Sequence, residues 1–126
     1  MLRKLMSGGA MAALVAVPSI ATAMTVNEFL AKADALKAKG VLAIGSSDIA
    51  VLRQEIMAAS DAYRAGLAAQ VAAGKKPSSC PPPKGTAKIG SEELVGAFRA
   101  LPPSRRSVSV KDAFAAFMTR RYPCKG

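Results

Sequence analysis

The sequence predicts an all-α fold, a small four-helix bundle held by one disulfide. Three observations lead to this prediction. Apolar residues recur at spacings of three and four in four segments, capping residues precede these segments, and two cysteines occur in a chain that opens like an exported protein. The predicted helices span residues 26–39, 48–73, 91–101 and 110–122.

Residues 1–23 have the features of a cleaved signal peptide. Arg3 and Lys4 give a basic start, an apolar stretch follows, and Ala21-Thr22-Ala23 offers small residues at the positions that a signal peptidase inspects. Cleavage would leave residues 24–126 as one helical domain, in the periplasm or secreted. An uncleaved anchor is the alternative, but a span needs roughly 20 strongly apolar residues and this stretch is diluted by glycine and alanine. We therefore expect no integral membrane segment after cleavage.

The first predicted helix begins with a capping box. The hydroxyl of Thr25 is placed to accept from the backbone N–H of Glu28, and the glutamate is placed to reach back. Gly40 provides a C-terminal stop. The apolar residues between them recur at helical spacing: Val26, Phe29, Leu30, Ala33 and Leu36.

The short apolar run 41–44 separates the first two helices. We expect an extended connector here, because an isolated strand would have no partner. Ser46 or Ser47 then caps the second helix, in which Gly66 costs roughly 1 kcal/mol relative to alanine. We expect Gly66 to admit a closely packed neighbour. The apolar stripe of this helix comprises Ile49, Leu52, Ile56, Ala59, Tyr63, Leu67 and Val71.

A proline-rich loop is predicted for residues 75–90, because Pro81-Pro82-Pro83 prevents regular backbone hydrogen bonding. Ser91 is the expected cap of the third helix, and Ser109 that of the fourth. If a simple turn joins these two helices, they run antiparallel. Their apolar faces comprise Leu94, Val95, Phe98 and Leu101 in the third helix, and Ala113, Phe114, Phe117, Met118 and Tyr122 in the fourth.

An even number of cysteines in an exported chain predicts a disulfide before free thiols or metal ligands. A bridge between Cys80 and Cys124 would fasten the start of the third helix to the end of the fourth. It would close a loop of about 45 residues, which the chain-entropy model values at about 4 kcal/mol. A reactive thiol at Cys80, near Lys76 and Lys84, is the alternative.

Basic residues dominate the charge. Outside the signal peptide, which holds Arg3 and Lys4, sixteen Lys and Arg stand against eight Asp and Glu. The basic doublets are scattered and are not interleaved with aromatic residues as a binder of single-stranded nucleic acid requires. We therefore expect no nucleic acid partner. Acidic envelope polymers, anionic lipid head groups or an acidic protein are the partners that such an exported chain would meet.

The chain contains no histidine. This removes the usual general base near neutral pH and the commonest metal ligand. Residues 85–90 carry the two glycines of a phosphate-binding loop, but Ser91 and Glu92 follow where that motif needs Lys and Ser or Thr. A glycosidase-like pair of carboxylates is the alternative, although helix capping and surface ion pairs account for the positions of the Asp and Glu residues. We expect a non-enzymatic protein with no cofactor and no bound metal.

Several short motifs stand in a characteristic order. Tyr63-Arg64-Ala65-Gly66 lies on a predicted helix, Cys80-Pro81 lies in a loop, and Tyr122-Pro123-Cys124 closes the chain. With the signal peptide, this order resembles the Rap/Tai family of small helical periplasmic immunity proteins, which inhibit peptidoglycan amidase toxins of type VI secretion systems. The resemblance implies a packing role for Tyr63 and Gly66 and a disulfide between the two cysteines. It departs at Ser60, where many members have a further cysteine.

The resemblance also implies a function, the occlusion of a secreted amidase's cleft by a protruding loop. The candidate partner-binding residues are Arg105 and Arg106, with Lys75 and Lys76 as second choice, since arginine pairs with carboxylates in bidentate fashion. The plainer interpretation is that these charges only keep two loops solvated. The competing functions are those of a periplasmic stress chaperone and of an envelope-polymer-binding protein. A homodimer is an alternative to the monomer.

Overall fold

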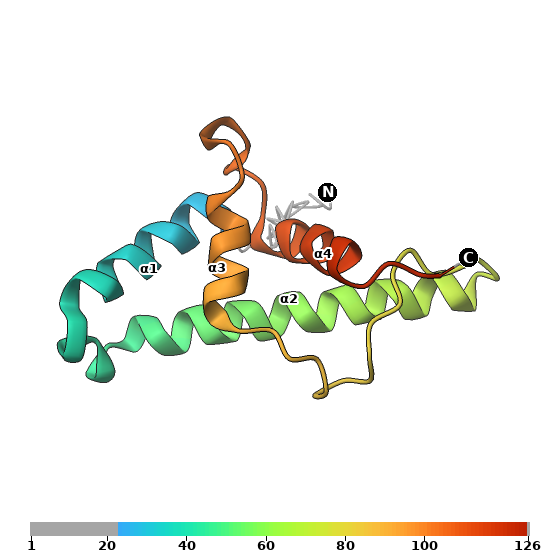
Figure 1. Ribbon diagram of the computed structural model, residues 1–126, viewed down its shortest axis with the longest axis horizontal. Coiled ribbons are helices and arrows are strands. Elements are labelled where there is room, and N and C mark those ends of the chain that lie inside the picture. The colour runs from blue at the N-terminus through green and yellow to red at the C-terminus, as the bar shows by residue number, and fades with distance from the viewer. Residues whose placement is uncertain (1–22, 126) are drawn as a thin grey trace, which may run out of the picture.

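The computed structural model describes residues 23–125 and confirms the all-α prediction for them (Figure 1). These residues contain four α-helices, two short 3₁₀ helices and no strand. The elements in chain order are α1 (Val26–Lys39), η1 (Gly40–Gly45), α2 (Ser47–Ala72), α3 (Ser91–Arg99), η2 (Pro103–Arg105) and α4 (Val110–Arg121). The predicted signal peptide lies, apart from Ala23, outside the described residues.

Three of the four predicted N-terminal caps are confirmed. The hydroxyl of Thr25 accepts from the N–H of Glu28 at 3.2 Å, Ser46 accepts from Asp48, and Ser109 accepts from Asp112. The cap predicted for α3 is wrong. Gly90 holds the cap position, and Ser91 is the first helical residue, so α3 begins without a side-chain cap.

The connector between α1 and α2 also differs from the prediction. Gly40 ends α1 with a φ of +56°, a backbone conformation that favours glycine. The chain then continues as η1 rather than as an extended segment. A 3₁₀ turn satisfies backbone groups within the segment itself, so the apolar run needs no partner strand.

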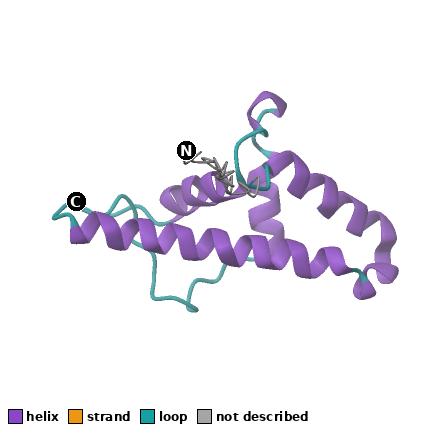
Figure 2. Ribbon diagram, turned by 180° about the vertical axis from the view of Figure 1, so that it is seen from behind, coloured by secondary structure: helices purple, strands orange, loops and turns teal. Residues whose placement is uncertain are grey.

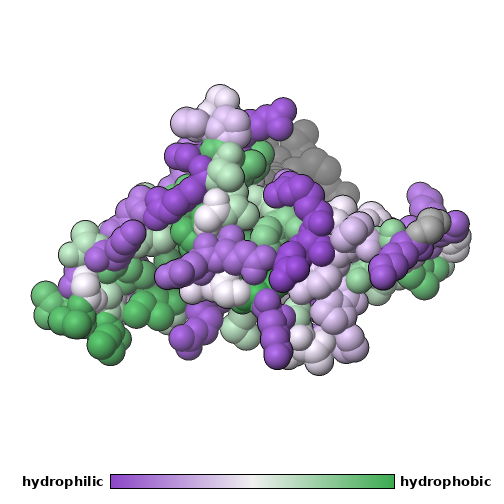
Figure 3. Space-filling model, viewed as in Figure 1, coloured by the Kyte–Doolittle hydropathy of each residue, from purple (hydrophilic) through white to green (hydrophobic). Residues whose placement is uncertain are grey.

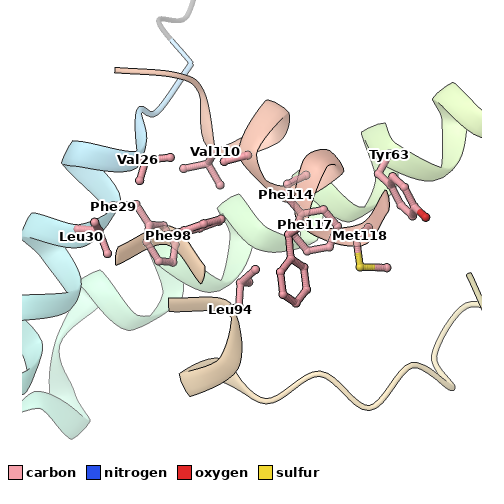
Figure 4. Packing of buried hydrophobic residues seen from close by; sticks show 12 residues of the cluster. Val26, Phe29, Leu30, Tyr63, Leu94, Phe98, Val110, Phe114, Phe117 and Met118 are labelled. Carbon is pink, nitrogen blue, oxygen red and sulfur yellow. The ribbon is translucent and has the colours of Figure 1, made fainter. Parts of the chain in front are cut away.

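The core lies where the four helices meet (Figure 4). Phe29 of α1 contacts Phe98 of α3 edge to face, with ring centroids 5.4 Å apart, and Tyr63 of α2 meets Phe114 of α4 in the same manner at 6.1 Å. The buried apolar residues are Val26, Phe29, Leu30, Ala59, Tyr63, Leu94, Phe98, Val110, Ala113, Phe114, Phe117 and Met118.

The long helix α2 is the spine of the fold. It forms its most extensive helix contact with α4, which lies along its C-terminal half and runs in the same direction, and it also contacts α1 (Figures 1 and 2). The antiparallel arrangement of the third and fourth helices was predicted on the condition that a simple turn joins them, and this condition is not met. The link between α3 and α4 is a protruding turn that contains η2, and it redirects the chain.

The start of the described chain is strapped to the segment before α4. The N–H of Val26 donates to Val108 O at 3.0 Å, Asn27 donates to Arg106 O, and Val110 donates to Met24 O. These bonds fix the first turn of α1 against the first turn of α4. Both Val26 and Val110 are fully buried there.

The predicted disulfide joins Cys80 and Cys124, whose Cα atoms are 4.9 Å apart. Its place differs from the prediction, because Cys80 lies early in the loop and near the end of α2 rather than at the start of α3. The bridge thus ties the loop that follows α2 to the segment that follows α4. A disulfide of this kind is typical of proteins outside the cytoplasm.

Two further features concern single helices. A Cβ atom at Gly66 would meet no atom within 4 Å, so the close neighbour expected there is absent.

Among residues 23–125, no helix combines the length and the apolar character that crossing a bilayer demands.

Candidate functional site

A large, open apolar groove lies on the described part of the chain. It has a volume of about 720 Å³ and lies between α1, α2, α3 and the second half of the loop before α3. We call it the central groove. Phe29 and Leu94 form buried parts of its wall, and half-buried aliphatic side chains continue it toward η1. Those side chains are Leu36, Ile49, Leu52, Ile56 and Ile89.

The charged residues that line the central groove are all basic. They are Arg53, Arg64 and Lys84, and no Asp or Glu lines the groove. Lys84 forms an exposed ion pair with Asp61, with a nitrogen–oxygen distance of 3.1 Å. The groove therefore presents apolar walls and a cationic rim to a ligand.

Arg64 is the best-positioned of the three basic residues. Its Nη2 donates to Pro82 O at 3.1 Å, which holds the guanidinium under the loop. Its Nε is buried and has no hydrogen-bond partner among the described residues. A buried N–H without an acceptor is costly, and an acceptor on a bound ligand would relieve that cost.

The loop that borders the groove is held at several points. The side chain of Gln70 accepts from Ser78 N at 2.7 Å and donates to the hydroxyl of Ser78. Further along, the Thr86 hydroxyl donates to Pro83 O, and Gly85 adopts a φ of +85° in this turn. The loop therefore has a defined path although it contains no helix.

Ser79 is the one buried polar residue of the described chain, at 1% exposure. Its hydroxyl accepts from the Tyr63 hydroxyl at 2.6 Å and donates to Tyr122 O at 2.8 Å, with Met118 O farther away at 3.3 Å. The adjacent Cys80 N–H donates to Tyr122 O. No pattern in the sequence predicted this cluster, which links α2, the loop and α4 beside the disulfide.

The predicted partner-binding residues do not form one site. Arg105 lies in the protruding turn and lines a smaller pocket of about 210 Å³ between α3 and α4. The guanidinium of Arg106 is used internally, because it donates to Leu101 O and to Arg99 O. Lys75 and Lys76 are exposed at the opposite end of the molecule, after α2.

The central groove was not predicted, because its residues were interpreted as core. Of the apolar stripe on α2, only Ala59 and Tyr63 are buried, and Val71 is 58% exposed. A signal was present in the sequence. The stripe of α2 is far longer than any other helix of the described chain, so no single helix can cover it.

The other titratable groups form surface pairs. The Arg99 side chain donates to Asp34, and this bond holds the pKa of the Asp34 carboxyl below its usual value while it raises the pKa of Arg99. Similar pairs join Lys32 to Asp48 and Arg121 to Glu93. No cluster of three or more acids or cysteines able to hold a metal ion occurs in residues 23–125.

Comparison of the chain with protein-family models, with curated proteins and with solved structures returned no match.

Proposed function

We propose that this chain is an exported, non-enzymatic binding protein that holds an apolar segment of a partner protein in the central groove. The observation that carries the proposal is the groove itself, about 720 Å³ in volume, with apolar walls, three basic residues and no acid. Such a surface suits a segment that places aliphatic or aromatic side chains between acidic ones. The basic excess of the chain would speed the approach of an acidic partner.

The location that fits this role is the periplasm or the medium. The features of a signal peptide in residues 1–23 support it, and so does the disulfide between Cys80 and Cys124.

The resemblance to Rap/Tai immunity proteins suggests a secreted peptidoglycan amidase as the partner. A second mode of contact is favoured by the protruding turn between α3 and α4 (Figure 1). There, Arg105 is exposed and its guanidinium has no hydrogen bond within the described residues, so it is free to pair with a carboxylate in an enzyme cleft. Arg106 is less suited to this role, because its guanidinium already holds two carbonyls.

The groove is tested first with a small probe, 8-anilinonaphthalene-1-sulfonate, which is apolar and anionic. We expect its fluorescence to rise on addition of the native protein. Met57 lines the groove and is 60% exposed, so Met57→Glu should suppress this signal without unfolding the chain. Val71→Glu is the matched control, because Val71 lies on the same helix at 58% exposure but outside the groove. Equal probe binding by both variants would refute a ligand site in the groove.

The partner is tested by inspecting the adjacent genes for a secreted amidase and, where one is found, by mixing that amidase with this chain. Co-purification and suppression of cell-wall hydrolysis are the expected results. Loss of both in Met57→Glu, with Arg105→Glu unaffected, would assign the contact to the groove. The reverse pattern would assign it to the protruding turn. Failure of the wild-type chain to bind or inhibit the amidase would remove the immunity function and leave the groove to another partner.

The competing functions make different predictions. Adhesion to an envelope polymer through basic residues should fade steeply with ionic strength, whereas a packed protein interface should lose mainly association rate. An acid-activated chaperone should expose apolar surface at low pH because its carboxylates become protonated. Four of the eight acids, Asp34, Asp48, Asp61 and Glu93, already form ion pairs with basic side chains.

A further inference from the structure

The turn between α1 and α2 exposes three large aliphatic side chains. Val41, Leu42 and Ile44 are 82%, 80% and 82% exposed, more than any other large apolar residue of the described chain. They occupy η1 at the end of the hairpin that α1 and α2 form, far from α4 (Figure 3, green at the lower left). We call these three residues the hairpin tip. Exposed apolar groups of this size mark an interaction surface rather than a packing defect when they gather at one place.

The 3₁₀ geometry sets the directions in which the tip side chains point. With three residues per turn, Val41 and Ile44 stand on the same side of η1, and Leu42 stands a third of a turn away. Ala43, on the remaining side, is half-buried. The tip is thus apolar over two of its three sides, and a protein pocket reached from one direction would leave part of it in water. An apolar medium that surrounds the tip would cover all three residues.

The charge next to the tip is positive. Lys37 and Lys39 lie in the last turn of α1, immediately before η1, and neither forms an ion pair within residues 23–125. The nearest acids are matched, since Asp34 pairs with Arg99 and Asp48 pairs with Lys32. The base of the tip therefore carries uncompensated positive charge.

We propose that the hairpin tip docks this protein on the surface of an anionic lipid bilayer. The three aliphatic side chains enter the boundary between head groups and acyl chains, while Lys37 and Lys39 contact anionic head groups. Apolar insertion combined with basic flanking residues is the combination that gives stable peripheral binding, since either alone is weak. The inference is independent of the proposed function, because none of the three tip residues lines the central groove.

Flotation with lipid vesicles tests the proposal. The mature chain should float with vesicles of equal parts phosphatidylcholine and phosphatidylglycerol and not with phosphatidylcholine alone. Replacing Val41, Leu42 and Ile44 together by serine should lower the partition coefficient at least tenfold, because several buried methyl and methylene groups are lost. Removing one lysine, with Lys37→Gln or Lys39→Gln, should lower it about fivefold. All these side chains are exposed, so the variants should melt like the wild type.

Matched controls separate the tip from general stickiness and general charge. Val51→Ser/Val71→Ser removes two other exposed apolar side chains, neither of which lines the central groove, and Lys75→Gln/Lys76→Gln removes two charges at the far end of α2. Both double variants should retain most of the vesicle binding. Equal loss in the controls and in the tip variants would overturn the proposal.

A fluorescent probe gives a second test. The chain contains no tryptophan, so Leu42→Trp introduces a single emitter at the tip. Its emission should shift to shorter wavelength with phosphatidylglycerol vesicles, whereas that of Val71→Trp should not. An unshifted tip emission would overturn the proposal. So would a dimer in sedimentation analysis that the triple serine variant dissociates, because the tip would then be covered by a second copy of the chain.

Discussion

The hydroxyl cluster around Ser79 allows a double-mutant cycle whose outcome follows from the hydrogen bonds. Ser79 has one hydroxyl proton, which it donates to a backbone carbonyl, and it accepts from the phenol of Tyr63. In Ser79→Ala the carbonyls keep other donors, since Met118 O accepts from Tyr122 N and Tyr122 O accepts from Cys80 N. The phenol of Tyr63, on a residue only 7% exposed, loses its partner.

The two single variants should lose different amounts of unfolding free energy. Ser79→Ala leaves a buried donor unpaired and should lower the free energy of unfolding by about 1–3 kcal/mol. Tyr63→Phe removes that donor and leaves the serine bonded to the backbone, so it should cost about 0.5–1.5 kcal/mol. The double variant has no unpaired phenol. Its loss should therefore fall short of the sum of the single losses by about 1 kcal/mol.

Urea denaturation, followed by far-UV circular dichroism, measures all four forms of the cycle. A loss of 1 kcal/mol should also lower the melting temperature by roughly 4–8 °C for a domain of this size. Strictly additive losses would refute the coupling between the two hydroxyls. Tyr63→Phe as costly as Ser79→Ala would refute the assigned direction of donation, because the serine would then depend on the phenol.

Three further predictions concern the disulfide, a helix glycine and an ion pair. Replacement of both Cys80 and Cys124 by serine should lower the free energy of unfolding by about 4 kcal/mol, measured in urea, because the unfolded chain gains loop entropy; a change near zero would contradict this estimate. Gly66→Ala should raise the free energy of unfolding by up to about 1 kcal/mol, and with it the melting temperature, since the added Cβ meets no atom within 4 Å. A lower melting temperature would reveal a contact at this position. The Arg99 bond lowers the pKa of Asp34 from 3.8, so the pair stabilises the fold above that pH and is lost as pH falls through the lower folded value. Asp34→Asn should therefore flatten the acid end of the stability profile slightly, and an unchanged profile would show that the exposed pair contributes nothing.

Local features of the sequence were sufficient for the helices. The first helix was predicted at residues 26–39 and occurs at Val26–Lys39, because Thr25 and Gly40 set its two ends through contacts within a few residues. The disulfide followed from the cysteine count, since only one pairing of Cys80 and Cys124 exists. Local predictions failed at η1, which is a 3₁₀ helix rather than an extended connector, and at the cap of α3.

The tertiary structure decided which helix faces meet and which remain open. That α4 packs mainly on α2 and runs parallel to it, with less contact to α3, depends on the paths of two long connections, and no periodic pattern encodes such a path. The same holds for the burial of Ser79 and for the central groove. A stripe of aliphatic residues specifies that a helix has an apolar face, because that face repeats every three or four residues. How far other helices cover that face is a property of the whole fold.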